Sequence, residues 1–208
     1  MRTLTKEIQQ SLTPAAALDV LMRGNQRFVQ NLKTNRNLLA QVNETSDGQH
    51  PFAVILSCMD SRTSVELIFD QGLGDIFSIR IAGNVLNDDI IGSIEFATKL
   101  VGTKIVLVLG HTRCGAITGA CNNVELGKLT GLLHKIRPAI EREVATKSDR
   151  TGGNPEFVQN VVELNVKLAM EDLQKQSSIV NQMAASGEIQ VVGGVYDIES
   201  GLVSILSK

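Results

Sequence analysis

The stretch KIVLVLG at residues 104–110 is a short, continuous apolar run, which is typical of a strand buried on both faces. Two similar runs come earlier in the chain, at residues 52–57 and 76–81. A helical pattern over 88–100 separates the second of these from the opening stretch. Buried strands that alternate with helices predict an α/β fold built on a parallel sheet.

Helices and a terminal hairpin surround these strands in the predicted fold. A Thr-Pro start predicts an amphipathic helix over 13–32, and an Asn-Pro start predicts a long helix over 155–175. The β-rich runs at 188–198 and 202–206 flank a short turn and predict an antiparallel hairpin. We expect a mostly parallel central β-sheet, with about four parallel strands and an antiparallel edge strand, flanked by helices and preceded by an N-terminal helical arm.

The chain of 208 residues has the length of one domain and contains no internal repeat or low-complexity tract. We expect a single domain over 1–208, with a helical arm and connection over about 1–50 and an α/β core over 51–208. No stretch has the length or hydropathy of a membrane span, and no secretory leader is recognisable.

The composition narrows the class of partner. Hydrophobic residues make up 43% of the chain, charged residues 20%, and the net charge is −2, which gives no electrostatic basis for binding nucleic acid or an anionic membrane. We expect a small-molecule substrate. Three unevenly spaced cysteines do not make a disulfide scaffold and favour a reducing compartment, so the expected location is cytoplasmic.

Two of these cysteines follow predicted strands. Cys58 comes after the first strand, and His111 and Cys114 come after the strand at 104–110, so a parallel sheet places all three at its carboxyl edge. Two thiolates and one imidazole suit tetrahedral Zn²⁺ and leave a fourth position for water. Alternatively, each residue alone could be an ordinary buried side chain. The ionisable pair Asp60 and Arg62 beside Cys58 favours a functional site.

Three motifs resemble those of the β-class carbonic anhydrases, in the same order. They are Cys-x-Asp-x-Arg at 58–62, Gly-Asp-x-Phe-x-x-Arg-x-Ala-Gly-Asn at 74–84 and His-x-x-Cys at 111–114. The resemblance extends over about 13–206. It implies reversible hydration of carbon dioxide to bicarbonate and a proton by zinc-bound hydroxide, with one Zn²⁺ per chain held by Cys58, His111 and Cys114.

The resemblance also implies roles for residues around the metal. Asp60 would orient the hydroxide, and Arg62 would pair with Asp60 and keep it off the metal; if that pair breaks, Asp60 could become a fourth ligand. A homodimer or dimer of dimers is implied, with active sites at the dimer interface and an N-terminal helix reaching the neighbour. The residues that match substrate-side positions are Gln49, Gly115, Phe77 and Phe96.

This chain departs from common patterns of the resembled family at a few positions. Thr63-Ser64 replaces a frequent Val-Pro, and Ile81 replaces a frequent Asn. Members regulated by bicarbonate carry a Trp where this chain has Ile55, and the chain contains no Trp, so we expect no bicarbonate effector pocket.

The same residues are also consistent with other functions. A zinc hydroxide could hydrolyse another linear heterocumulene, such as carbon disulfide or carbonyl sulfide. A metal- or redox-sensing module could use the two thiolates, although that does not account for Asp60, Arg62 and Gln49. A nucleotide-binding function has weak support, because no glycine-rich phosphate loop follows a strand. No role is assigned to the remaining candidates, Cys121, His50 and His134.

Overall fold

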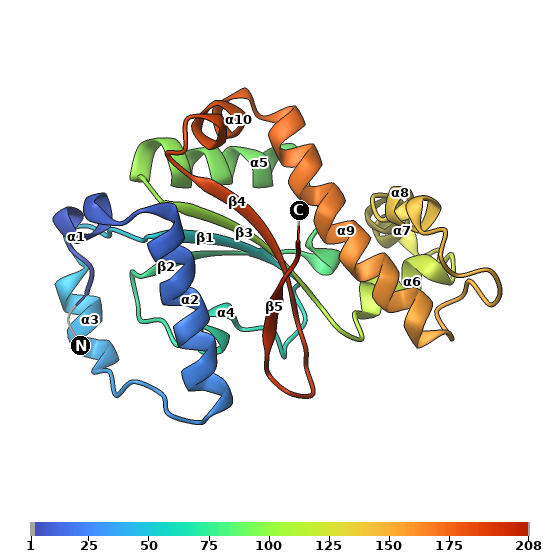
Figure 1. Cartoon of the computed structure of the whole chain (residues 1–208), viewed down its shortest axis with the longest axis horizontal. Coiled ribbons are helices and arrows are strands. Elements are labelled where there is room, and N and C mark those ends of the chain that lie inside the picture. Colours follow the sequence, from blue (N-terminus) through green and yellow to red (C-terminus); the bar gives the residue numbers. More distant parts are fainter. Residues whose placement is uncertain (1–2, 208) are drawn as a thin grey trace.

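The computed structural model describes residues 3–207, so positions 1–2 and 208 of the expected domain lie outside it. A five-stranded sheet crosses the molecule in the order β2-β1-β3-β4-β5 (Figure 1). The first four of these strands in the sheet run parallel, and β5 pairs antiparallel with β4. The predicted fold class is therefore confirmed. The strands are β1 (Ala53–Ser57), β2 (Ile76–Arg80), β3 (Ile105–His111), β4 (Gln190–Tyr196) and β5 (Val203–Ile205).

The register of the parallel strands brings their ends together. Ser57, the last residue of β1, lies opposite Arg80 in β2 and Leu109 in β3. Every residue of β1 and β3 is buried, as their continuous apolar sequences predict. Residues that follow β1 and β3 therefore leave the sheet at the same carboxyl edge.

Helices cover both faces of the sheet (Figure 1). On one face, Leu21 of α2 (Pro14–Val29) packs with Ile55 and Leu107 of the sheet. Val54 precedes Ile55 in β1, and neighbouring residues of a strand point to opposite faces. On the other face, Val54 therefore packs with Ile94 of α5. The helices on this second face are α5 (Asp88–Glu95), α9 (Pro155–Gln176) and α10 (Ser178–Ala185).

The predicted helix starts are confirmed by their caps. Thr13 accepts a hydrogen bond from the Ala16 amide at 3.2 Å, and Pro14 occupies the first turn of α2. Asn154 caps α9 in the same way, accepting from the Phe157 amide at 3.3 Å. Such caps satisfy amides that have no partner within the helix.

Several short elements were not predicted. They are α1 (Lys6–Ser11), α3 (Leu38–Glu44), α4 (Val65–Ile68), the 3₁₀ turn η1 (Ala82–Asn84), α7 (Gly127–His134) and α8 (Arg137–Arg142), together with the exact extent of α6 (Gly115–Cys121). The helix expected over 88–100 is present, but its second half is the wider π-helical segment η2 (Phe96–Val101). In Figure 1, α6, α7 and α8 lie together beside the N-terminal half of α9.

The N-terminal arm is anchored to the core of its own chain. Ala17 and Leu21 of α2 are fully buried in the core. The Gln9 amide of α1 donates to the carbonyl oxygens of Pro51, at 2.7 Å, and Val101, at 3.1 Å. The single-domain organisation stays a prediction. Across residues 3–207, no helix combines the length and apolar character needed to cross a membrane.

Candidate metal centre

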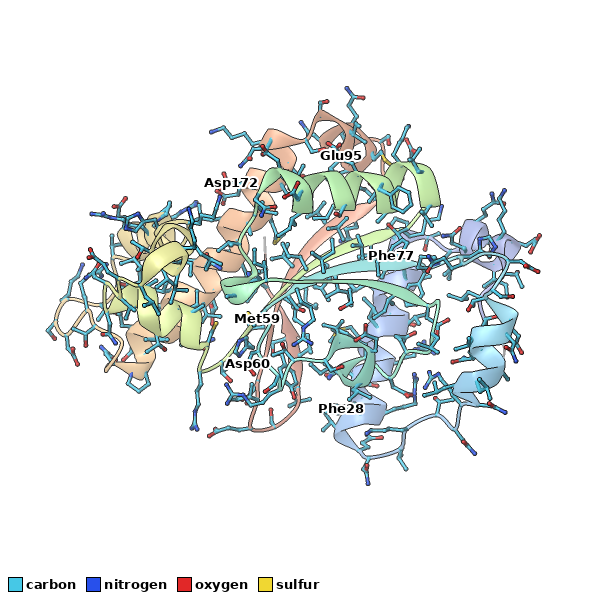
Figure 2. All side chains as sticks on the ribbon, turned by 180° about the vertical axis from the view of Figure 1, so that it is seen from behind. Phe28, Met59, Asp60, Phe77, Glu95 and Asp172 are labelled. Carbon is cyan, nitrogen blue, oxygen red and sulfur yellow. The ribbon has the colours of Figure 1, made fainter. Side chains whose placement is uncertain are left out.

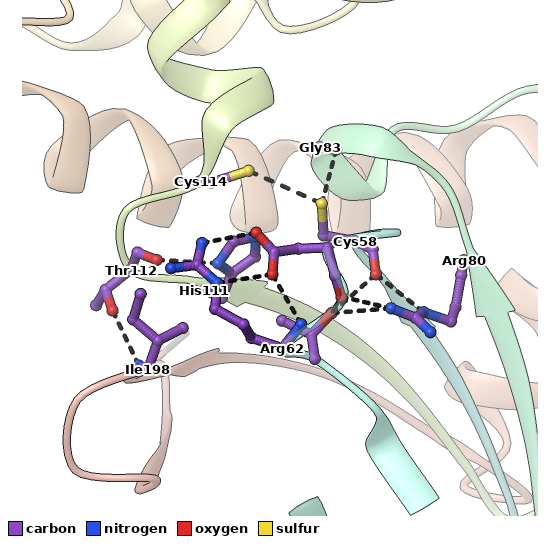
Figure 3. Close-up of polar contacts among 10 residues, drawn as sticks. Cys58, Arg62, Arg80, Gly83, His111, Thr112, Cys114 and Ile198 are labelled. Atoms are coloured by element: carbon purple, nitrogen blue, oxygen red, sulfur yellow. Dashed lines mark hydrogen bonds and ion pairs between the residues drawn. The ribbon is translucent and has the colours of Figure 1, made fainter.

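Three potential metal ligands meet at the carboxyl edge of the sheet (Figure 3). Cys58 follows β1, His111 ends β3, and Cys114 directly precedes α6. One ligand atom from each lies within 4.8 Å of the other two, and all three residues are buried. The structure thus brings together the residues that the sequence motifs single out.

The geometry of this group fits a tetrahedral metal. The Cys58 and Cys114 Sγ atoms lie 3.9 Å apart, and two sulfurs each about 2.3 Å from a tetrahedral metal would lie about 3.8 Å apart. His111 Nε2 is buried without a hydrogen-bond partner among residues 3–207. An unpaired buried nitrogen is costly, and a metal ion would satisfy it. This group could therefore hold a metal ion, and its donor set suits Zn²⁺.

The orientation of His111 is set by the residue that follows it. His111 Nδ1 lies 2.9 Å from the Thr112 carbonyl oxygen, so Nδ1 carries the proton and Nε2 presents its lone pair. Thr112 is itself held by the β4–β5 hairpin: its amide donates to Tyr196 O at 3.0 Å, and its hydroxyl donates to Asp197 at 3.2 Å. The Ile198 amide donates to the same hydroxyl at 3.1 Å.

The contact between the two thiols shifts their pKa values in opposite directions. A hydrogen bond from the Cys114 thiol lowers the pKa of Cys58 below its ordinary value. The same contact, together with burial, raises the pKa of Cys114 above its ordinary value. The first proton therefore leaves easily and the second is retained until a cation compensates the charge, so metal binding releases protons.

Gly83 supports the Cys58 sulfur from the 74–84 motif. Its amide donates to Cys58 Sγ at 3.4 Å, a contact that favours the thiolate. Gly83 has φ +68, and a Cβ there would lie 2.9 Å from the Ile136 Cδ1 atom. Glycine satisfies both the left-handed backbone and the close approach of Ile136.

Asp60 and Arg62 form a bidentate ion pair beside the ligands. Arg62 Nε donates to Asp60 Oδ1 at 2.9 Å, and Nη2 donates to Oδ2 at 2.7 Å. These hydrogen bonds hold the pKa of Asp60 well below its ordinary range. Asp60 Oδ2 also lies 4.0 Å from His111 Nε2. An ionised carboxylate thus stands next to the ligand group while Arg62 restrains it.

Of the four predicted substrate-side residues, only Gly115 lies at this group. It directly follows Cys114, and apart from its chain neighbours and its own helix backbone, no heavy atom of residues 3–207 lies within 4 Å of where its Cβ would be. Gln49 precedes β1, whereas Cys58 follows it, and a five-residue strand spans roughly 16 Å. Phe77 lies near the start of β2, and its ring centroid is 6.3 Å from that of Phe96. Figure 2 shows Phe77 well away from Asp60 along the sheet.

Sequence reasoning missed the residues that support the ligands. Gly83 belongs to the recognised 74–84 motif, so its position could have been suspected. Thr112 lies between the two ligands of the His-x-x-Cys segment, but its contact with Asp197 spans 85 residues. No local pattern indicates such a contact.

Comparison with known proteins agrees with this fold. The family model described as carbonic anhydrase matches residues 53–203. Carbonic anhydrase 2 of Mycobacterium tuberculosis is 35% identical over 200 residues, covering 90% of this chain and 90% of that protein. The carbonic anhydrase of Mycolicibacterium smegmatis is 32% identical over 196 residues, covering 93% of this chain and 94% of that protein.

Solved structures extend the comparison to the β class. A β-carbonic anhydrase of Aspergillus fumigatus matches with a TM-score of 0.74 and 31% identity, covering 93% of this chain and 90% of that one. A tetrameric β-carbonic anhydrase of Sordaria macrospora has the same fold, with a TM-score of 0.70 and 24% identity over 78% of this chain and 84% of that one. The chain belongs to the carbonic anhydrase family, in its β class. It is an enzyme, and the reaction of this family is the hydration of carbon dioxide.

Proposed function

We propose that this chain hydrates carbon dioxide reversibly with one Zn²⁺ held by Cys58, His111 and Cys114. The observation that carries the proposal is the buried, unpaired His111 Nε2 facing two sulfurs at tetrahedral spacing. When bound, the metal would supply a hydroxide nucleophile at neutral pH, because zinc lowers the pKa of coordinated water to about 7.

Asp60 acts next to this nucleophile as a hydrogen-bond acceptor. Arg62 donates two hydrogen bonds to Asp60 Oδ1, from its amide and its Nε, and one to Oδ2, from its Nη2. A carboxylate oxygen has two lone pairs, so Oδ2 keeps one for a hydroxyl hydrogen at the ligand group. Accepting that hydrogen orients the nucleophilic lone pair toward the substrate.

Arg62 has two effects on Asp60 in this proposal. It keeps the carboxylate ionised, as the lowered pKa of Asp60 indicates. It also holds the carboxylate away from the ligand group, since both oxygens are engaged by the guanidinium. Loss of the pair would free Asp60 to approach the metal as a fourth ligand and block the reaction.

A second copy of the chain supplies the remaining substrate contacts. Gln49 lines a surface hollow of about 460 Å³ at the amino end of β1, so it cannot serve the ligand group of its own chain. Phe77 lies in β2, an edge strand, and Phe96, whose ring centroid is 6.3 Å from that of Phe77, is exposed. Exposed apolar side chains at a sheet edge favour association, so a homodimer or dimer of dimers would join these residues to a partner's metal group.

The cytoplasm is the proposed location of the reaction. Cys58, Cys114 and Cys121 are all buried and unpaired, and thiols in this state suit a reducing compartment. Ile55 is fully buried inside β1, which supports the expectation that no bicarbonate effector pocket opens there.

Stopped-flow hydration of carbon dioxide on purified protein, with zinc quantified per chain, tests the proposal. We expect zinc close to one ion per chain and activity that disappears on chelation and returns with added Zn²⁺. Turnover of carbon disulfide or carbonyl sulfide in place of carbon dioxide would favour the alternative heterocumulene substrate. Zinc-loaded protein without activity on any of these substrates would refute the proposal.

A further inference from the structure

The Thr63 hydroxyl contacts the backbone of the loop that carries Cys58 and Asp60. Thr63 Oγ1 lies 2.9 Å from the carbonyl oxygen of Cys58 and 2.9 Å from that of Asp60. The Thr63 amide also donates to Asp60 O, at 3.0 Å. The side chain is 1% exposed, so water does not compete for these hydrogen bonds.

Arg80, at the end of β2, reaches the same two carbonyl oxygens (Figure 3). Its Nε donates to Cys58 O at 3.2 Å, and its Nη2 donates to Asp60 O. A hydroxyl has one proton and can donate to only one carbonyl at a time. Arg80 therefore supplies the donors that Thr63 lacks, and Nη2 lies 3.5 Å from Thr63 Oγ1. Together the two side chains bind both carbonyls.

Met59, between the two bonded residues, is 63% exposed, so its side chain does not anchor the loop by packing. Cys58 is buried, and the Gly83 amide donates to its sulfur. The hydrogen bonds to the Cys58 and Asp60 carbonyls attach the main chain of the loop on both sides of Met59. The orientation of each carbonyl fixes the peptide plane, and hence the direction in which the neighbouring Cβ atoms project.

We infer that Thr63 and Arg80 are positioning residues, which direct the Cys58 sulfur and the Asp60 carboxylate toward the same metal. This inference rests on the proposed zinc function. Thr63 directly follows the Cys-x-Asp-x-Arg motif at 58–62 and is not part of it. The hydroxyl contacts are therefore not required by the motif itself.

Zinc release from the loaded enzyme into a chelator is the measurement that tests the inference. We expect Thr63→Val to release zinc about tenfold faster than the unaltered chain, the size typical of lost support behind a metal ligand. Thr63→Ser, which keeps the hydroxyl, should restore release to within about twofold. In the cobalt-substituted protein, Thr63→Val should also shift the thiolate-to-metal absorption bands, and Thr63→Ser should not.

Two further variants separate positioning from general stability. Thr98→Val is the matched control: Thr98 is equally buried, and its hydroxyl donates to Ile94 O at 2.8 Å, but it lies in η2, away from the metal group. It should leave zinc release unchanged. Arg80→Lys keeps the charge without the two-point contact and should accelerate release several-fold, which tests the inference even if Thr63→Val folds poorly.

The outcomes distinguish this inference from the proposed function. A chain that takes up no zinc would overturn both. Zinc-loaded, active protein in which Thr63→Val and Arg80→Lys release zinc at the original rate would overturn the inference and leave the function intact. Equal acceleration by Thr63→Val and Thr98→Val would also overturn it, because the effect would then follow from buried hydroxyls in general.

Discussion

The Asp60 carboxylate stands 4.0 Å from His111 Nε2 while Arg62 binds both of its oxygens. This distance is too long for a hydrogen bond, so the carboxylate lies beside the ligand group without bonding to His111. The arrangement keeps a negative charge at the ligand group without letting it become a ligand. In the proposed mechanism, the activity depends on this restraint.

Replacing a ligand should remove the metal. Cys58→Ser exchanges a thiolate for a poor ligand, so we expect zinc affinity to fall at least ~100-fold and hydration activity to fall with it. Cys121→Ala is the matched control, because Cys121 is also buried but lies outside the ligand group, and burial raises the pKa of its thiol to about 11. Chelator competition measures the zinc affinity of both variants. Equal zinc affinity of Cys58→Ser and the unaltered chain would contradict the ligand assignment.

Neutralising Asp60 should impair the reaction without removing zinc. Asp60→Asn keeps the shape of the side chain but weakens it as an acceptor, so we expect kcat/KM to fall about 100-fold with zinc content unchanged. Asp19→Asn, in an exposed ion pair with Arg23, should have no effect. Stopped-flow assays measure kcat/KM, and metal analysis measures the zinc content of each protein. If the kcat/KM of Asp60→Asn stays within twofold of that of the unaltered chain, Asp60 does not orient the nucleophile.

Removing the Arg62 guanidinium should change the pH dependence. Hydrogen bonds from Arg62 hold the pKa of Asp60 below its ordinary range, so the carboxylate stays ionised as pH falls. In Arg62→Gln, the pKa of Asp60 should rise toward about 4. Above about pH 6 the carboxylate stays ionised in both proteins. There the kcat/KM of the variant should fall at least about tenfold, because Asp60 is no longer oriented and can compete for the fourth metal position.

Below about pH 5, protonation of Asp60 should add a further loss in Arg62→Gln only. The ratio of kcat/KM between the two proteins, followed across pH at constant zinc content, measures both effects. A ratio that does not change with pH would show that Arg62 does not control the ionisation of Asp60.

A buried ion pair that anchors the N-terminal arm should contribute to stability in a pH-dependent way. Burial of Asp70 would raise its pKa, but hydrogen bonds from Arg27, Arg36 and Thr34 outweigh that effect and lower it to about 2. Because the folded pKa lies below the unfolded value of about 4, this stabilisation is complete above about pH 4 and is lost as pH falls toward about 2.

Asp70→Asn should therefore lower the free energy of unfolding by about 2–4 kcal/mol at neutral pH, since it also leaves Arg36 buried without a counter-charge. Urea unfolding across pH measures this difference, which should shrink below about pH 4. The exposed pair of Asp19 and Arg23 provides the control, and Asp19→Asn should change stability by less than about 0.5 kcal/mol. A difference for Asp70→Asn that persists at low pH would show that packing, not charge, is responsible.

Mixed assemblies should show whether two chains share each active site. Cys58→Ser lacks the metal group, and Gln49→Ala lacks the proposed partner contact, so each alone should have reduced activity. In a mixed dimer, one site would join an intact Cys58 from one chain to an intact Gln49 from the other. Activity of the co-refolded mixture above the average of the two variants supports sharing; activity equal to that average would show that Gln49 does not contribute to a partner's site.

Local sequence was sufficient for the elements whose signals are strong and close together. The buried runs of β1 and β3 and the capped starts of α2 and α9 were predicted within a few residues. The short helix α3 was missed inside a polar stretch, because its seven residues span only about two turns and carry little periodic signal. The π-helical turn of η2 was missed because its sequence pattern resembles that of an α-helix.

The same division holds for the site. Sequence alone singled out Cys58, His111 and Cys114 as candidate ligands, since each follows a recognisable strand and the carboxyl ends of parallel strands meet at one edge. Only the tertiary structure decided that Gln49 and Phe77 lie at the far end of those strands, and that Thr63, Arg80 and Asp197 support the ligand loops. Such contacts depend on how distant segments pack, and packing leaves no periodic trace in the chain.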